Sequence, residues 1–347
     1  MKKTLAALIV TAFAASAANA AVVYDNEGTK VELNGSLRVI MEKADKKEYD
    51  AANHSTKKSN SALRNAGSRF GITVKHNLDN DFYALGRVEF RFDDTTSRDK
   101  FGGVYAKRAY VGLGSKATGD ITFGRQLTIA DDLSQAVDYE YGFIPKSEYI
   151  PTAGTGVVRY DYKGIEGLQL SANYNFGQTN DEKGNPLKPG IKNAYAVGAL
   201  YTVGDLDARL AYGHTNFETG ASYAHRLDGV LASLGYKFGD FTLTGDFAYG
   251  HEKFDDEKTN KFYVAPGFAY QVLPASKVYG NYLYERVKGE NTKDKTHGFL
   301  LGADYKLHKQ VVLFVEGKYV TAKKYTNDAY DGKVKDRAIG VGMRVFF

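Results

Sequence analysis

The side chains with the clearest potential for chemistry are acids, and they are concentrated in one stretch without a regular period. From Leu127 to Gly156 the chain fits neither strand nor helix, and it contains Pro145, Pro151 and a single lysine, Lys146. Its acids are Asp131, Asp132, Asp138, Glu140 and Glu148. A connection this long inside a compact domain is usually functional. Carboxylates held beside water attract cations and orient polar solutes, so we expect this segment to act through its charge.

Residues suited to covalent or metal chemistry show no matching arrangement. The seven histidines are scattered without metal-ligand spacing, and the chain has no cysteine. His251 and Glu252 begin like a zinc-protease motif, but the second histidine is missing. The sequence therefore predicts no enzyme, no metal site and no cofactor.

Alternating polar and apolar residues flank the acidic stretch on both sides. From Lys30 to Glu42, apolar side chains such as Leu37 occupy one face and polar ones such as Arg38 the other, with Ile40 as the exception. This period of two predicts a β-strand. At about a dozen residues, the segment exceeds the about five or six of an average soluble strand and suits the tilted strand of an outer-membrane barrel.

The same rhythm recurs about sixteen times up to Phe347, with short turns alternating with long polar connections. We expect the long connections at residues 43–65, 178–191, 218–226, 252–260, 289–295 and 323–335. Short turns on one rim and long loops on the other are typical of outer-membrane barrels. We therefore predict an all-β fold, a 16-stranded antiparallel transmembrane β-barrel, with a long third loop (residues 127–156) folded into its lumen.

Aromatic residues and the C-terminal segment favour the same architecture. Many outward positions near strand ends hold Tyr or Phe, which form girdles at membrane interfaces. The alternating segment from Ile339 to Phe347 would leave an exposed apolar edge in a soluble protein. In a barrel it closes the edge by pairing with the first strand.

The N-terminus has the pattern of a secretory signal peptide. Lys2 and Lys3 precede an apolar run from Leu5 to Ala18, and an A-x-A cleavage site ends at Ala20. We expect residues 1–20 to be removed and residues 21–347 to form one domain, since the rhythm does not change along the chain. Without two lysines the formal charge falls from +5 to +3 and is spread out, which predicts no nucleic-acid partner.

Several segments resemble the general bacterial porins, which are trimeric, sixteen-stranded channels of the Gram-negative outer membrane, and in particular the major porins of the Pasteurellaceae. They are MKKTLAALIV…ASAANAAVVY, ALRNAGSRFGI, KRAYVGLGSKATGDITFGRQLTIAD, EYGFIPKSEYIPT, YKGIEGLQLSANY and the terminal Phe347. The resemblance covers essentially the whole chain. It implies a water-filled channel for passive diffusion of ions and small hydrophilic solutes.

In this family the third extracellular loop narrows the pore, and its acids face arginines on the opposite wall. The resemblance assigns the constriction acids to Asp131, Asp132, Asp138 and Glu140. It assigns the basic pore wall to Arg38, Arg69, Arg108 and Arg159. Arg38 stands in for a family lysine whose position holds Ser36 here. Residues 142–146 replace the Pro-Glu-Phe-Gly-Gly motif of enteric porins, so which of these acids point into the pore stays open.

The resemblance also implies partners. Arg125 matches the family position near the subunit interface, where residues 93–103 of a neighbouring subunit latch, and alternation places it on the outer face with Ile121 and Phe123. The implied partners are a second and third copy in a homotrimer, outer-membrane lipid and lipopolysaccharide, and the barrel-assembly machinery through Phe347.

Three other functions stay open as alternatives. A more selective channel, for example for nucleosides or nucleotide fragments, would share the fold and the location. An outer-membrane enzyme such as a phospholipase is disfavoured because no Ser/His constellation falls on one strand face. A secreted adhesin is disfavoured because the strands have the length that a lipid bilayer requires.

Overall fold

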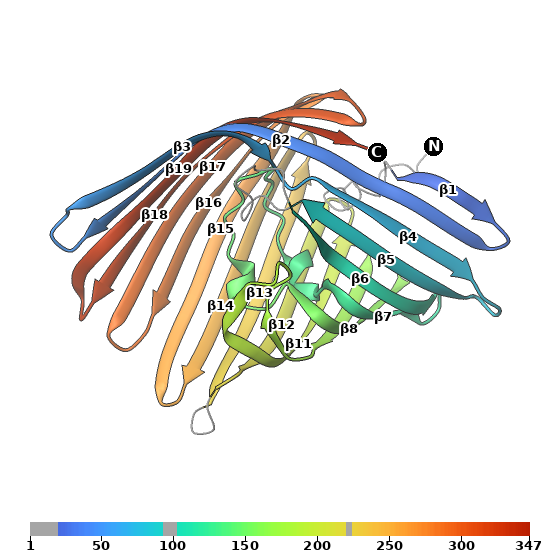
Figure 1. Ribbon diagram of the computed structural model, residues 1–347, viewed down its shortest axis with the longest axis horizontal. Coiled ribbons are helices and arrows are strands. Elements are labelled where there is room, and N and C mark those ends of the chain that lie inside the picture. The colour runs from blue at the N-terminus through green and yellow to red at the C-terminus, as the bar shows by residue number, and fades with distance from the viewer. Residues whose placement is uncertain (1–19, 93–102, 220–223) are drawn as a thin grey trace.

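The computed structural model describes residues 20–92, 103–219 and 224–347, and nearly all of them lie in β-strands (Figure 1). The strands are β1 (Ala21–Asn26), β2 (Thr29–Asp50), β3 (Ser55–Asn65), β4 (Arg69–Asn77), β5 (Phe82–Phe92), β6 (Val104–Ser115), β7 (Gly119–Leu127), β8 (Ala153–Ile165), β9 (Leu168–Asn175), β10 (Gln178–Asn180), β11 (Pro186–Val203), β12 (Leu206–Phe217), β13 (His225–Phe238), β14 (Phe241–Phe254), β15 (Glu257–Leu273), β16 (Ser276–Lys288), β17 (Thr292–His308), β18 (Val311–Thr326) and β19 (Ala329–Phe346). Within these ranges, no helix is both long and apolar enough to cross a membrane. The signal peptide predicted over residues 1–20 and most of the latch predicted at residues 93–103 lie outside the described residues.

The strands form one closed antiparallel ring. Strands that follow one another in sequence pair, except β3 with β4 and β9 with β10. β19 closes the ring by pairing with β2, from residues 346 and 36 to residues 332 and 50. β3 and β4 both pair with β2, one after the other along its length, and together count as one strand of the ring. β9 and β10 pair with β11 in the same way. β1 is a short addition to the edge of β2. The predicted antiparallel barrel of 16 strands is therefore confirmed.

Side chains alternate between the two faces of the wall as the sequence predicts. On β2, Leu37 and Met41 are 57% and 62% exposed, whereas Arg38 and Ile40 are 9% and 0% exposed. Apolar exposure suits an outer face that meets hydrocarbon. We predict a girdle from outward aromatic residues, and the exposed ones include Tyr174, Phe176, Tyr212, Phe238, Tyr249, Tyr270, Tyr305 and Tyr319.

Most of the predicted long polar connections are strand instead. Residues 43–65 belong to β2 and β3 except for a turn at residues 51–54, and β14 and β15 are joined only by Asp255 and Asp256. The error has a physical cause. Beyond the lipid both faces of a hairpin meet water, so the alternation that marks a strand disappears while the backbone pairing continues.

Candidate functional site

Residues 128–152, which join β7 to β8, are the longest connection among the described residues and are hereafter called the 128–152 segment. The predicted loop ran to residue 156, but β8 already begins at Ala153. The segment contains the short 3-10 helices η1 (Ile129–Leu133) and η2 (Lys146–Glu148). Thr128 joins its two ends: the Thr128 amide donates to the Thr152 carbonyl at 3.0 Å, and its hydroxyl donates to the Pro151 carbonyl at 2.6 Å. The segment is therefore closed at its base.

Apolar side chains of the 128–152 segment pack against the face of the wall opposite the exposed apolar one. Ile129, Leu133, Tyr149 and Ile150 are all at most 2% exposed. Their partners on β11 to β16 are Ala196, Ala211, Leu231, Ala248, Tyr263, Ala265 and Leu283. Full burial of one large apolar side chain contributes about 1.5–3 kcal/mol, so this small core fixes the segment to one side of the barrel.

Glycines of the wall permit an approach that a larger residue would prevent. A Cβ atom at Gly229 would lie 2.2 Å from the Tyr149 carbonyl oxygen, and one at Gly213 would lie 2.5 Å from Cγ2 of Ile150. Unbonded heavy atoms do not come that close. Other wall glycines that face the segment in the same way are Gly198, Gly235, Gly298 and Gly340. The sequence shows that glycine is common, but not that these glycines face one segment.

The strongest polar anchor of the segment is Glu316 of β18, which is not among the predicted site residues. Its carboxylate is completely buried and accepts the backbone amides of Tyr139, Glu140 and Tyr141 at 2.7, 2.8 and 2.5 Å. The Tyr279 hydroxyl donates a further hydrogen bond at 2.8 Å. Hydrogen bonds to a charged acceptor are worth about 1.5–3 kcal/mol each. A buried charge with four donors is therefore well satisfied.

Further anchors come from strands β14 and β16. The Asp246 carboxylate accepts the Ser134 hydroxyl at 2.6 Å and the Gln135 amide at 3.1 Å. The Asn281 side-chain amide donates to the Val137 carbonyl at 2.7 Å. Together with Glu316, these contacts hold the middle of the segment against strands β14 to β18.

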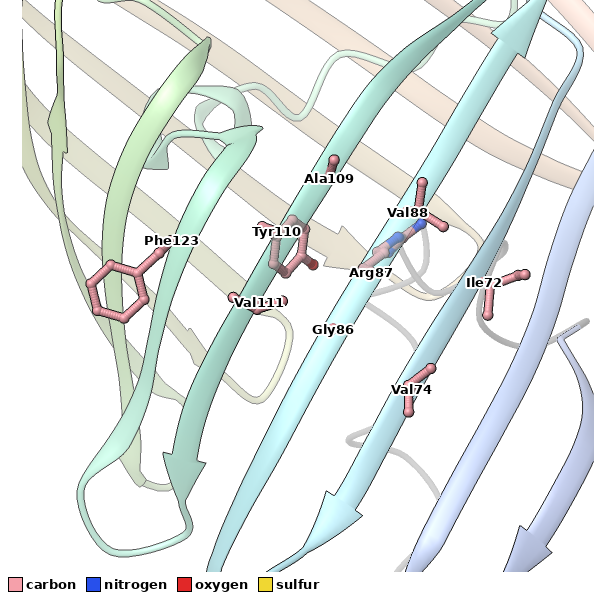
Figure 2. A pocket seen from close by; sticks show the side chains of 9 residues that line it. All are labelled: Ile72, Val74, Gly86, Arg87, Val88, Ala109, Tyr110, Val111 and Phe123. Atoms are coloured by element: carbon pink, nitrogen blue, oxygen red, sulfur yellow. The ribbon is translucent and has the colours of Figure 1, made fainter.

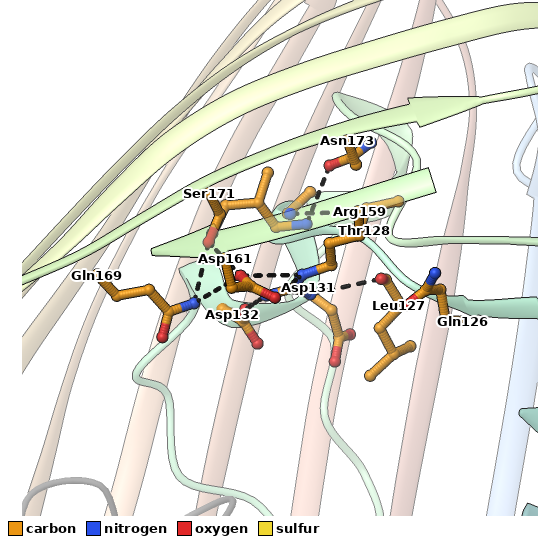
Figure 3. A network of polar contacts seen from close by, with 12 residues as sticks. Gln126, Leu127, Thr128, Asp131, Asp132, Arg159, Asp161, Gln169, Ser171 and Asn173 are labelled. Carbon is orange, nitrogen blue, oxygen red and sulfur yellow. Dashed lines mark hydrogen bonds and ion pairs between the residues drawn. The ribbon is translucent and has the colours of Figure 1, made fainter. Parts of the chain in front are cut away.

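Asp132 is the one predicted acid that pairs with a predicted arginine. Arg159 of β8 donates to its carboxylate at 2.7 Å and to Asp161 of the same strand at 2.9 Å (Figure 3). Gln169 and Ser171 of β9 in turn donate to Asp161, which completes the network. Arg159 is thus held between two carboxylates near the base of the segment.

Two other predicted acids pair with bases that were not predicted. Asp131 lies 3.4 Å from the Lys146 ammonium within the same segment. Glu140 lies 2.6 Å from Arg64 of β3, which also contacts Glu42 of β2 at 2.8 Å. Lys146 offsets the charge of Asp131, whereas Arg64 is shared between Glu140 and Glu42 and offsets that of Glu140 only in part.

Asp138 differs from the other three acids because it is exposed. No ion pair of its carboxylate falls within 4 Å among the described residues, although Arg344 and Lys146 are close enough to interact with it electrostatically. Although its surface reaches solvent, the dense protein around the Asp138 carboxylate and the nearby Glu316 carboxylate raise the pKa of Asp138 to about 6. The charge of this side chain therefore depends on pH near neutrality.

Arginines are concentrated on the inner face of β19, β2, β4, β5 and β6. Arg344 lies opposite Arg38 where β19 pairs with β2, and Arg69 lies opposite Arg91 where β4 pairs with β5. The set, hereafter the arginine cluster, is Arg38, Arg69, Arg87, Arg91, Arg108 and Arg344. The cluster begins beside the anchor strands, because β19 pairs with β18. Arg344 donates to the Tyr139 carbonyl of the 128–152 segment, and the cluster extends from there through β2 to β6.

Three members of the arginine cluster, Arg38, Arg69 and Arg108, are among the predicted pore-wall residues. Arg87, Arg91 and Arg344 are not among the predicted residues. The sequence pattern does place Arg87 and Arg91 in the lumen, because they lie two residues on either side of Glu89 on the polar face of β5.

Ser36 and Arg125 are two further positions to which the resemblance gave a role. Ser36, at the family lysine position, is buried and accepts a hydrogen bond from Nε of Arg38 at 2.7 Å. Arg125 of β7 donates to the carbonyls of Ala106 and Glu182, both at 3.0 Å. Its described contacts are therefore with its own chain.

Comparison with known proteins agrees with this architecture. The family model described as Gram-negative porin matches residues 4–325. The chain is 32% identical to the major outer membrane protein of Pasteurella multocida strain Pm70 over 379 aligned residues, which cover all of both chains. A second Pasteurella multocida major outer membrane protein is 31% identical, again over the whole of both chains.

Solved structures with the same fold are more distant in sequence. In-vitro folded OmpT, an outer membrane protein of Vibrio cholerae, has a TM-score of 0.71 at 18% identity, covering 94% of this chain and 99% of that one. The anion-selective porin from Comamonas acidovorans has a TM-score of 0.63 at 19% identity, covering 92% and 100%. With the family model matching most of its length, this chain belongs to the Gram-negative porins and is an outer-membrane β-barrel channel for passive diffusion, not an enzyme.

Proposed function

We propose that the 128–152 segment narrows an aqueous lumen against the arginine cluster and that charges on its two sides set the selectivity for ions and small hydrophilic solutes. The observation that carries this proposal is the anchoring of the segment to strands β14 to β18 by Glu316 and its neighbours. The arginine cluster lies on β19, β2 and β4 to β6. Acids of the segment are near enough to act on it: Asp131 on Arg108, and Asp138 on Arg344.

The mechanism is electrostatic. Acids on one side of a narrow gap and guanidinium groups on the other create a field across the direction of travel. A polar solute orients in this field, whereas an apolar solute displaces ordered water without compensation. Rings of charged side chains and the width of the pore decide which ions pass. Arginine suits such a wall because it stays charged at every relevant pH.

Charge neutralisation tests this mechanism. Replacing Asp131, Asp132, Asp138 and Glu140 by Asn or Gln together is expected to shift the zero-current potential of a planar bilayer under a KCl gradient toward anion preference. Replacing Arg69 and Arg108 by Gln is expected to shift it toward cation preference. Asp255→Asn, at the exposed turn between β14 and β15, is the matched control and should change nothing. Unchanged potentials in both lumen variants would refute the assignment while leaving the channel intact.

Asp138 makes the selectivity depend on pH. Its pKa is raised to about 6, so the carboxylate is charged above that pH and becomes neutral as the pH falls through it. Lowering the pH from about 7.5 to about 5 removes one negative charge from the lumen, and the zero-current potential is expected to move toward anion preference. The Asp138→Asn variant should show a smaller step over the same range. An equal step in both proteins would assign the pH dependence to another group.

We also propose that the protein is a homotrimer. The outer face of β4 to β7 has an apolar hollow where Gly86 and Ala109 are flanked by larger side chains, including Ile72, Val111 and Phe123 (Figure 2). A flat apolar wall with a hollow of this kind suits packing against another copy. OmpT of Vibrio cholerae is described in a trimer form. Slower migration of unheated than of boiled protein on a detergent gel would support the trimer.

Lipopolysaccharide is the proposed lipid partner. On the outer face, one cross-strand row joins Arg286 of β16, Lys295 of β17, Lys323 of β18 and Lys333 of β19. The row follows the exposed apolar band that includes Phe299 on β17, so it is positioned to meet anionic headgroups at the membrane surface. Mass spectrometry of protein extracted in mild detergent would detect the retained lipid.

Removal of residues 1–20 and recognition of Phe347 by the barrel-assembly machinery complete the proposal. The backbone of Phe347 exchanges two hydrogen bonds with Gly35, at 2.8 and 3.1 Å. Phe347 is therefore part of the barrel seam, and its side chain is 37% exposed. An N-terminal sequence of the mature protein that begins at Ala21 would support the cleavage.

A further inference from the structure

The arginine cluster holds far more positive than negative charge. Five of its six guanidinium groups lie around one carboxylate, that of Glu89, which is 3% exposed, whereas Arg344 interacts with Glu140, Asp138 and Glu316. Arg87 and Arg91 donate to the two oxygens of Glu89 at 3.0 and 2.9 Å, and Arg108 lies 3.8 Å from it. A carboxylate has about four lone-pair positions, so Glu89 cannot satisfy the whole set.

Several donors of the cluster have no protein acceptor. In the described residues, the buried Nε atoms of Arg87, Arg108 and Arg344 have no hydrogen-bond partner. The three come from β5, β6 and β19, so the unmatched donors span the patch. Buried donors are normally paired, and each exception calls for an explanation. Their common need is an acceptor that carries negative charge and several oxygens.

Nearby acids do not meet this need. Asp131 and Asp138 act on the cluster only at long range and have no hydrogen bond to it. Glu140 is held by Arg64 and by the backbone anchor at Glu316. Arg344 donates to the Tyr139 carbonyl through another nitrogen and lies over the Tyr139 ring, but the Nε atoms of Arg87, Arg108 and Arg344 still lack an acceptor among the described residues. The cluster is therefore a preformed set of cationic donors that borders the segment.

We propose that the arginine cluster is a transient binding site for the phosphate group of small phosphorylated solutes. This inference rests on the proposed function and names a class of solute for the same lumen. A phosphomonoester is a dianion above a pH of about 6, and its three terminal oxygens match the planar forks of several guanidinium groups at once. Chloride has no directional acceptors, and a monocarboxylate offers half the charge. Conduction requires the binding to be weak enough to release the solute.

The test is block of chloride current by glycerol phosphate in planar bilayers at pH about 7.5. In the unmodified protein, added glycerol phosphate is expected to reduce the current with a half-blocking concentration lower than that of succinate. Succinate carries the same charge on two separate carboxylates. Glycerol and lactate supply the uncharged and singly charged controls. Equal block by succinate and glycerol phosphate would overturn the assignment to phosphate.

Variants separate the shape of the site from its charge. Arg91→Gln and Arg108→Gln are each expected to raise the half-blocking concentration about tenfold, the effect of losing a charged hydrogen bond. Lysine at either position keeps the charge, so the zero-current potential should stay while block weakens. Arg226→Gln, at an exposed position on β13, should leave block unchanged. Full block by the lysine variants would show that only the field matters and would overturn the site.

The outcomes also separate this inference from the proposed function. If the protein carries an ohmic chloride current but glycerol phosphate does not block it selectively, the binding site is refuted and the channel function stands. Absence of any current through correctly folded protein removes both. If the glutamine variants do not fold, the lysine variants and the comparison of solutes on the unmodified protein decide the question.

Discussion

Replacing Glu316 by alanine is expected to release the middle of the 128–152 segment from the barrel wall and to increase the single-channel conductance. The variant removes the acceptor of three backbone amides and of the Tyr279 hydroxyl. Each bond to the charged carboxylate is worth about 1.5–3 kcal/mol. A loss of only about 3 kcal/mol shifts the population of the docked segment about 100-fold. Conductance in planar bilayers, together with protease cleavage within the segment, measures this release.

The conservative variant and a surface control sharpen this test. Glu316→Gln keeps the shape, but its NH₂ group would face amide donors, so partial release is expected. Glu290→Ala removes an exposed carboxylate between β16 and β17 and should behave as the unmodified protein. Normal conductance and a protease-resistant segment in Glu316→Ala would show that the apolar core alone holds the segment.

Adding one methyl group at Gly229 is expected to displace the segment as well. The new Cβ atom of Gly229→Ala would lie 2.2 Å from the Tyr149 carbonyl, and neither the strand nor the segment backbone can avoid the clash by rotating a side chain. Overpacking of this kind costs about 1–3 kcal/mol. The expected result is loss of the heat-resistant barrel at a lower temperature, read as a change in migration on detergent gels, with altered conductance.

Gly245→Ala is the matched control for this change. It adds the same methyl group to the neighbouring strand, where no atom lies within 4 Å of the new Cβ position. Its thermal behaviour should equal that of the unmodified protein. Equal destabilisation by the two substitutions would trace the effect to strand propensity, not to contact with the segment.

The barrel could be predicted because lipid imposes a simple rule on the sequence. Leu37 and Met41 face outward and Arg38 faces inward, and this alternation needs no knowledge of distant contacts. Ile40, the apolar exception on the inner face, is explained by contacts with residues distant in the sequence instead. It is completely buried in a cluster with Tyr141 of the 128–152 segment and Phe314 of β18.

The anchors of the segment could not be predicted by the same reasoning. Glu316 is one polar inward residue among many, and its partners at Tyr139 to Tyr141 are remote in sequence. Gly229 is likewise unremarkable until the fold brings Tyr149 against it. The acids themselves were visible in the sequence, but their pairing with Arg64 and Lys146 depends on the path of the segment.

The seam between β2 and β19 has a consequence for the order of folding events. Most other neighbouring strands form local hairpins, but Ser36 meets Phe346 only after every intervening strand is in place. Joining residues so far apart carries a large entropic cost and delays the last step. Until then two unpaired edges can capture a strand from another molecule. β1 pairs with the same edge of β2, just beyond the position of Phe347. It therefore covers part of that unpaired edge before β19 pairs with β2.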